Sequence, residues 1–176
     1  MKALRKGLPY THAAIVARSG SGIERIEDLR GKRFAFGDRM STSSYLVPRS
    51  MLAEAGIRLE DLKEHAFKGN HDDVARAVLA GEYDAGGLME STAGKFLDQG
   101  LKVLKTSVEI PEFNICASKG LDAGTQESTR KALAALNRRN EGHAQVLAMI
   151  DQEYTGFVAA EDGDYDGVRK LMHMIA

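Results

Sequence analysis

Apolar and polar positions change period repeatedly along the chain, from short apolar runs to stripes with helical spacing. Runs of small, β-branched or aromatic residues predict strands at residues 13–17, 33–36, 63–67, 83–89, 101–104 and 113–117. Helical patterns occur at residues 23–29, 44–55, 70–80, 91–99, 125–137, 141–152 and 165–175. Strands that alternate with helices indicate an α/β fold.

The helix predicted over residues 70–80 has the clearest boundaries, because Asn70 can cap its first turn and Gly81 suits its end. Pro48 interrupts the helix predicted over residues 44–55. Since proline has no N–H to donate, we expect a kink or a late start there. In the helix over residues 141–152, the side chains expected to face inward are Val146, Met149 and Ile150.

The chain has 176 residues, enough for one full domain or for one lobe and part of another. Lys and Arg number 24 against 25 Asp and Glu, so the net charge of −1 provides no basic field for nucleic acid. Cys116 is the only cysteine, which excludes an intrachain disulfide and a cysteine-rich zinc site. The five histidines have no ligand spacing with one another, and no metal or other cofactor is predicted.

Two junctions between a predicted strand and a predicted helix carry the candidate chemistry, because α/β sheets bind ligands at the carboxyl ends of their strands. Ser41, Thr42 and Ser43 offer three hydroxyls and unpaired backbone N–H groups at a helix start, which suits a tetrahedral oxyanion. His71, at the second junction, can donate a ring N–H to an anion. The plainer alternatives are a simple helix cap and a solvent-exposed or packed histidine.

A hydrolase is a further alternative, with Ser43 as nucleophile and His71 as base. The sequence has no Gly-x-Ser-x-Gly turn and no evident third member of a triad. It also has no P-loop and no Gly-x-Gly-x-x-Gly after a strand. These residues therefore favour binding over catalysis, and we predict that the protein is not an enzyme.

Several segments taken together resemble one family. They are YTHAAIVAR (10–18), SGIERIEDLRGK (21–32), FAFGDRMSTSSYLVP (34–48), GNHDDV (69–74), GEYDAG (81–86), IP (110–111) and YTGFV (154–158). The pattern is similar to that of substrate-binding proteins of phosphate, phosphite and phosphonate ABC transporters, which have the type II periplasmic binding protein fold of two closing lobes. The resemblance implies one α/β domain over residues 1–176, with a mixed, mostly parallel sheet and helices on both faces. Its parts would be a second lobe over about 10–118 and C-terminal helices over 119–176.

The resemblance also implies a solute-binding component of an ABC importer, which binds phosphonate, phosphite or phosphate without catalysis and docks on a permease. Ser41, Thr42 and Ser43 would receive the oxygens of the anion, and His71 would donate a further hydrogen bond. Glu90 lies near the position where some members hold an acid against the organic part of the ligand. The alternative for Glu90 is a surface glutamate that opens a helix.

Two departures from the family modify these expectations. Glu112 directly follows Ile110 and Pro111, so the acid that amine-binding members carry after this pair is shifted or missing, which favours phosphate, phosphite or a small alkylphosphonate. Only nine residues precede Tyr10, so we expect most of the first lobe to be absent and binding to be weak. Apolar surface left near Ala13 and Ile115 would permit a homodimer.

The family is periplasmic, but the start of this sequence carries no recognisable export signal. We therefore expect a periplasmic protein by resemblance, and a cytoplasmic one if these residues are the full native product. No apolar run approaches the roughly 20 residues that span a bilayer. Three alternatives stay open: a ligand-sensing module of a regulatory protein, a remnant that folds without binding, and an enzyme that reuses the fold.

Overall fold

The computed structural model describes residues 1–175, and their packing divides the chain into two compact units. The larger unit consists of His12–Ile110 and the segment from Asp166 onward, and the smaller unit of Met1–Thr11 and Pro111–Tyr165. The prediction of a single domain over residues 1–176 does not describe this division. The difference arises because the first residues pair with a strand near residue 155 rather than with the larger unit.

The chain passes from one unit to the other at two short strands. They are β2 (Tyr10–Thr11) and β8 (Ile110–Pro111), which form a two-stranded sheet of their own. The C-terminal helices predicted over residues 119–176 do not belong to one unit. Those before Asp166 lie in the smaller unit, and the last helix lies in the larger one.

A five-stranded sheet forms the centre of the larger unit, in the order β5–β4–β6–β3–β7. Its strands are β3 (Ala13–Arg18), β4 (Arg33–Phe36), β5 (Glu64–Phe67), β6 (Ala85–Met89) and β7 (Leu101–Thr106). Strand β4 runs parallel to both β5 and β6, whereas β3 runs antiparallel to β6 and to β7. Four strands therefore run one way and β3 the other, which confirms the predicted mixed, mostly parallel sheet.

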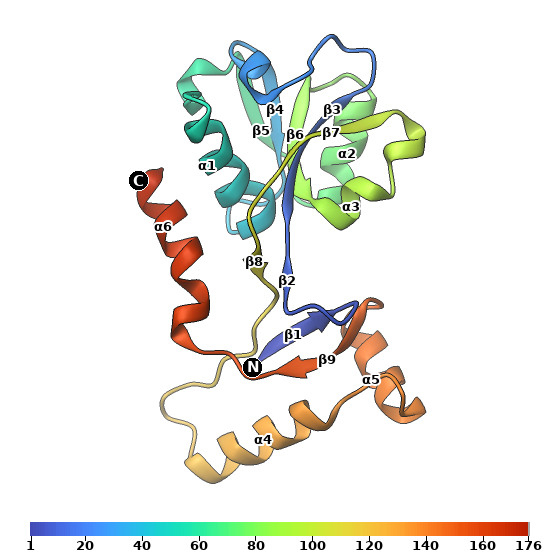
Figure 1. Ribbon diagram of the computed structural model, residues 1–176, viewed down its shortest axis with the longest axis vertical. Helices are drawn as coiled ribbons and strands as arrows, with labels where there is room; N and C mark the ends of the chain where they lie inside the picture. The colour runs from blue at the N-terminus through green and yellow to red at the C-terminus, as the bar shows by residue number, and fades with distance from the viewer. Residues whose placement is uncertain (176) are drawn as a thin grey trace. The chain divides into compact units, whose positions relative to one another are not determined.

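Helices cover both faces of this sheet, because successive side chains of a strand point to opposite sides. Ile15 of β3 joins the buried cluster under α1 (Val47–Glu54), a helix on which α6 (Asp166–Met174) also packs. Val16, the next residue, joins the opposite cluster, under α2 (His71–Leu79) and α3 (Glu90–Gly94). Figure 1 shows α1 and α2 on opposite sides of the sheet, as predicted.

The helices of the larger unit differ from the prediction at the proline and after β6. The helix predicted over residues 44–55 begins as a π-helical turn, η2 (Thr42–Leu46), and becomes α-helical only from Val47, next to Pro48. The helix predicted over residues 91–99 breaks into α3 and the 3-10 turn η4 (Leu97–Gln99), and Gly100 ends it with a φ of 99°. Two further 3-10 turns are η1 (Ile26–Leu29) and η3 (Leu59–Asp61).

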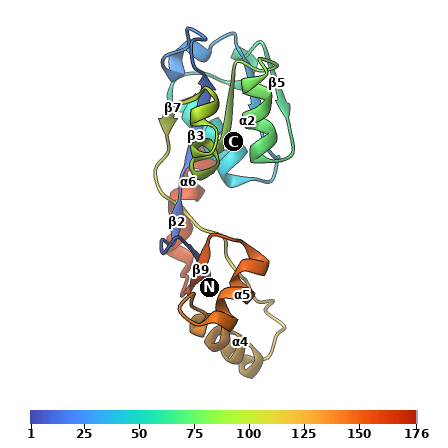
Figure 2. The same ribbon diagram turned by 90° about the vertical axis from the view of Figure 1, so that its right-hand side faces the viewer.

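The smaller unit is built on two strands that are far apart in the sequence. Strand β1 (Lys2–Arg5) pairs antiparallel with β9 (Tyr154–Val158). Helices α4 (Ala123–Ala135) and α5 (Glu141–Ile150) pack against β9 (Figure 2), and the 3-10 turn η5 (Asp162–Tyr165) follows it. The buried apolar cluster of this unit is small and consists of Ala3, Leu147, Tyr154 and Phe157.

Two sequence predictions in the smaller unit are wrong. No strand forms over residues 113–117, where Asn114 alone makes an isolated bridge to Lys2. In α5 the buried residue is Leu147, whereas the three side chains predicted to face inward are 45%, 87% and 55% exposed in the order Val146, Met149 and Ile150. The physical reason is the narrow support beneath α5, since a two-stranded sheet covers only part of the face of a helix.

Arg5 ties the two parts of the smaller unit together through ion pairs. Its guanidinium lies 2.8–3.0 Å from carboxylate oxygens of Glu112, Asp151 and Glu153. Burial alone lowers the pKa of Arg5, but the hydrogen bonds to these carboxylates raise it, so the guanidinium stays charged. The side chain of Glu112 is only 1% exposed, and without Arg5 its charge would be buried and uncompensated.

Gly86 in β6 leaves no room for a side chain. A Cβ there would lie 2.5 Å from Val74 Cγ1 and 3.1 Å from the Ala35 carbonyl oxygen. We expect Gly86→Ala to lower the free energy of unfolding by about 1–3 kcal/mol, the usual cost of overpacking. Urea denaturation measures this change. Gly94→Ala is the control, because a Cβ at Gly94 meets nothing within 4 Å. An equal loss in both variants would contradict this account of β6.

Acid is expected to destabilise the smaller unit. Hydrogen bonds from Lys6 and then Arg5 hold the pKa of Glu153 below its ordinary value of 4.5. Because the folded pKa is the lower one, this carboxylate stabilises the fold above pH 4.5, and the stabilisation is lost as the pH falls through the folded pKa. Hydrogen exchange of the β1–β9 amides against pH measures the effect. Glu153→Gln should reduce the dependence of β1–β9 protection on pH. An unchanged pH profile in that variant would refute the role of Glu153.

Candidate functional site

The carboxyl ends of adjacent parallel strands bring the two predicted junctions to one edge of the sheet. Lys68 and Gly69, after β5, donate backbone hydrogen bonds to the carbonyls of Phe36 (2.8 Å) and Gly37 (3.0 Å), at the end of β4. Gly37 is packed so closely against η2 that a Cβ there would lie 2.2 Å from Ser44 Oγ. The segments that lead into η2 and into α2 therefore lie side by side.

The turn at residues 41–44 starts a helix, and its first backbone N–H groups have no acceptor within the helix. Ser41 Oγ accepts the N–H of Ser44 at 3.1 Å, and Leu46 donates the first bond of the turn to the Ser41 carbonyl at 3.1 Å. The amides of Thr42 and Ser43 precede that bond, so no carbonyl of the helix is available to them. Ser43 is only 8% exposed. Ser41 thus acts as the helix cap, and the amides of Thr42 and Ser43 have no hydrogen-bond partner within the helix.

His71 is fixed from two sides as the first residue of α2. Asn70 caps this helix and accepts the N–H of Asp73 at 2.9 Å, as the sequence predicts. Nδ1 of His71 accepts the backbone N–H of Met89, at the end of β6, at 3.0 Å. A neutral imidazole has one acceptor and one donor nitrogen, so this bond leaves the proton on Nε2. Strand β6 therefore holds His71 in the tautomer that donates from Nε2.

Glu90 follows β6 at the same edge and contacts residues that the sequence analysis did not identify. Thr106 Oγ1, at the end of β7, donates to Glu90 Oε1 at 3.1 Å, and His12 Nδ1 lies 3.4 Å from Glu90 Oε2. The Glu90 amide donates to the His12 carbonyl at 2.9 Å. The side chain of Glu90 is 47% exposed. The carboxylate is therefore held by two side chains and still reaches solvent.

No local signal in the sequence points to His12 or Thr106. Because β3 runs opposite to β6 and β7, its first residues meet the last residues of both strands. Only the strand order brings these side chains to Glu90, and sequence periodicity does not contain that order.

Glu112 lies in the smaller unit. Arg5 Nε donates to Glu112 Oε2 at 2.9 Å, and the Phe113 amide donates to Oε1 at 3.1 Å. Both carboxylate oxygens are thus occupied by the protein. The expectation that the acid of amine-binding members is shifted or missing in this chain stays a prediction.

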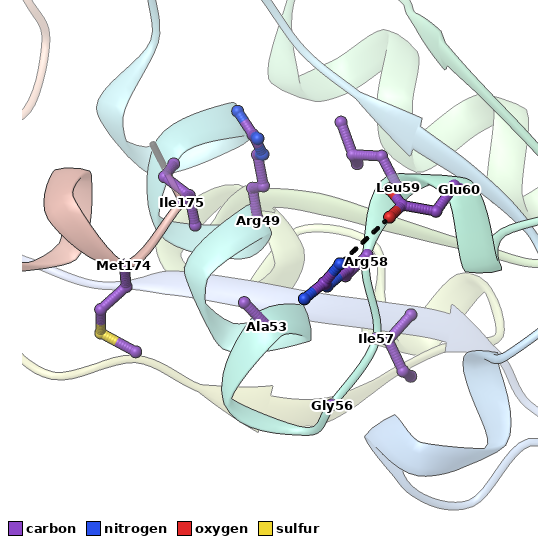
Figure 3. A pocket seen from close by; sticks show the side chains of 9 residues that line it. All are labelled: Arg49, Ala53, Gly56, Ile57, Arg58, Leu59, Glu60, Met174 and Ile175. Atoms are coloured by element: carbon purple, nitrogen blue, oxygen red, sulfur yellow. Dashed lines mark ion pairs between the residues drawn. The ribbon is translucent and has the colours of Figure 1, made fainter.

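A pocket of about 760 Å³ lies in the larger unit beside the ends of α1 and α6 (Figure 3). None of the five predicted binding residues lines it. Arg58 and Glu60 form an ion pair of 3.6 Å within it. The lining residues are Arg49, Ala53, Gly56, Ile57, Arg58, Leu59, Glu60, Met174 and Ile175.

Residues 1–175 contain no cluster suited to a metal ion and no helix suited to span a membrane. No group of three or more His, Cys, Asp and Glu side chains in this range is arranged to hold a metal ion. None of the helices described is long and apolar enough to cross a membrane.

Curated proteins of known families match this chain over most of its length. A probable phosphite-binding protein of an ABC transporter, PhnD1 of Prochlorococcus marinus, is 25% identical over 163 residues, which cover 86% of this chain and 54% of the relative. The phosphate-import protein PhnD of Mycolicibacterium smegmatis is 26% identical over 182 residues, which cover 92% and 57%. The chain thus spans little more than half the length of these relatives.

The fold agrees with that of a solved member. The structure of Prochlorococcus marinus PhnD1 in complex with methylphosphonate superposes with a TM-score of 0.83 at 22% identity and covers 97% of this chain and 69% of that one. At this identity the likeness shows the periplasmic binding protein fold alone. The family model for periplasmic substrate-binding proteins of phosphonate ABC transporters matches residues 1–165. The chain therefore belongs to the family of periplasmic substrate-binding proteins of phosphonate ABC transporters.

Proposed function

We propose that this protein binds a phosphorus oxyanion (phosphonate, phosphite or phosphate) as the solute-binding component of an ABC importer and does not catalyse a reaction. Membership of the family supports this role, as do the phosphite and phosphate that the relatives' names specify. The observation that carries the proposal is the convergence of Thr42, Ser43 and His71 donors at one edge of the sheet, through the Gly69–Gly37 backbone bond.

The binding groups that we propose are neutral donors. Thr42 and Ser43 would contribute hydroxyls and backbone N–H groups, Ser41 would shape the turn, and His71 would donate from Nε2. Glu90 would face the organic part of the ligand. Neutral donors compete with water, so we expect a dissociation constant of ~1 mM for this chain, about 4 kcal/mol weaker than a micromolar site.

The partners and the compartment follow the family. We propose that the protein works with an ABC permease and in the periplasm, since the family consists of periplasmic substrate-binding proteins. A homodimer remains a prediction. Of the two residues expected near its interface, Ile115 is 42% exposed, whereas Ala13 is fully buried and contributes no surface.

Titration with phosphate, phosphite, methylphosphonate, aminoethylphosphonate and sulfate tests the proposed function. A ligand that binds only the folded state adds RT ln(1 + [L]/Kd) to stability, so about 2.7 kcal/mol is expected at a hundredfold excess over Kd. We expect one phosphorus oxyanion to raise the melting temperature and sulfate to have no comparable effect. Isothermal calorimetry of the same series gives Kd directly.

Three variants make this titration specific to the candidate site. Ser43→Ala and His71→Ala should each weaken binding about fivefold to tenfold, the cost of one hydrogen bond of about 1–1.5 kcal/mol. Ser128→Ala is the matched control, because Ser128 is exposed on α4 in the smaller unit. Equal losses in all three variants, or no shift with any anion at tens of millimolar, would refute the proposed site.

The tautomer of His71 is a separate prediction. Long-range ¹⁵N–¹H correlation near neutral pH should show an acceptor-type Nδ1 and a protonated Nε2, because Met89 donates to Nδ1. A spectrum of the opposite tautomer would mean that His71 cannot donate from Nε2 to an anion. His71→Ala identifies the signals.

A further inference from the structure

An arginine lies in the loop that leads from β4 into the candidate site. Asp38 fixes this loop: its Oδ1 accepts the Met40 amide at 2.7 Å, and its carbonyl accepts the Ser41 amide at 3.0 Å. Arg39 lies within this turn, two residues before Ser41. Its backbone position is therefore tied to the residues proposed to hold the anion.

The side chain of Arg39 is fixed by an aromatic ring. Its Cζ lies 4.3 Å from the ring centroid of Phe67, the last residue of β5. Phe67 packs in turn against Tyr45 of η2, with a centroid separation of 5.1 Å. Phe67 and Tyr45 both pack against the buried cluster under α1. The guanidinium is thus held at the end of β5, on the face of the sheet that carries η2.

The guanidinium of Arg39 contacts an aromatic ring. Among residues 1–175 it has no carboxylate partner and donates no hydrogen bond, whereas Arg49 donates to the Tyr45 hydroxyl at 3.1 Å. Stacking uses the face of the guanidinium and leaves its N–H groups available in the plane. Such a group matches the oxygens of a phosphoryl anion.

Arg39 lies within about one Debye length of the proposed anion site at 0.1 M salt. Two residues lie between Arg39 and Thr42, so the Cα atoms of Arg39 and Thr42 lie within about 11 Å of each other. The Debye length is about 10 Å at 0.1 M salt and about 30 Å at 0.01 M. A charge at Arg39 therefore acts on an anion at Thr42 and Ser43, most strongly in low salt.

We propose that Arg39, held by Phe67, is a specificity-determining residue whose fixed positive charge attracts the oxyanion to the neutral donors of the site and strengthens its binding. This inference rests on the proposed function and adds to it the one cation of the Gly37–Ser44 loop. The negative charge in that loop, Asp38, is bonded to the Met40 amide. The site should accordingly favour dianions over monoanions of the same size.

The test is the salt dependence of methylphosphonate affinity, measured by calorimetry at pH 8 in about 0.01 M and about 0.5 M salt. We expect Arg39→Gln to weaken binding about twofold to sixfold at low salt and to have little effect at high salt, because salt screens an exposed charge. Arg39→Lys keeps the charge and should retain most of the salt dependence. Phe67→Leu keeps the apolar packing but removes the aromatic ring. This variant should lose part of the salt dependence, because Arg39 is then less firmly held.

Lys32→Gln is the matched control, because it removes one positive charge from an exposed residue just before β4, at the opposite end of that strand. Unchanged low-salt affinity in Arg39→Gln, or an equal loss in Lys32→Gln, would overturn the role of Arg39 while the proposed function stands. If the unchanged protein binds no anion in the titration series, both proposals fail, and that result is distinct from a loss confined to Arg39→Gln.

Discussion

The larger unit depends on one arrangement, the parallel alignment of β4 with both of its neighbours. The register of Phe36 opposite Phe67 and of Ala35 opposite Gly86 makes these strands end at one edge of the sheet. The segments after β4 and β5 then exchange backbone hydrogen bonds, and the Met89 amide, at the end of β6, reaches the His71 side chain. A shift of one residue in this register would turn every side chain of β4 to the other face and separate the donors.

Close packing beneath that edge keeps the alignment fixed. Gly86 and Gly87 let helices approach β6 from both sides, since a Cβ at Gly86 would meet Val74 at 2.5 Å and one at Gly87 would meet Pro48 at 2.5 Å. Pro48, which delays the start of α1, is therefore also a packing residue of the sheet. The same proline leaves the preceding turn π-helical, and that turn contains Thr42 and Ser43.

The sequence predicts features that are encoded locally and misses those encoded by strand order. The Asn70 cap, the left-handed Gly81 with its φ of 74° and the interruption at Pro48 all have neighbouring signals, and each occurs in the structure. The contacts of Glu90 with Thr106 and His12 had no such signal, because three strands contribute them. The binding roles of Ser41, Thr42, Ser43, His71 and Glu90 are compatible with their shared edge and await the titrations.

The smaller unit was the least predictable part for a physical reason. Strands β1 and β9 are short, and β1 buries only Ala3, so neither has a strong alternating pattern. Their pairing joins Lys2 to Val158. During synthesis, β1 leaves the ribosome about 150 residues before its partner β9. Residues 12–110 form nearly all of the larger unit and can fold in that interval. Strand β1 must therefore wait for β9 before it can pair, and the loop that this pairing closes is long and slow to close.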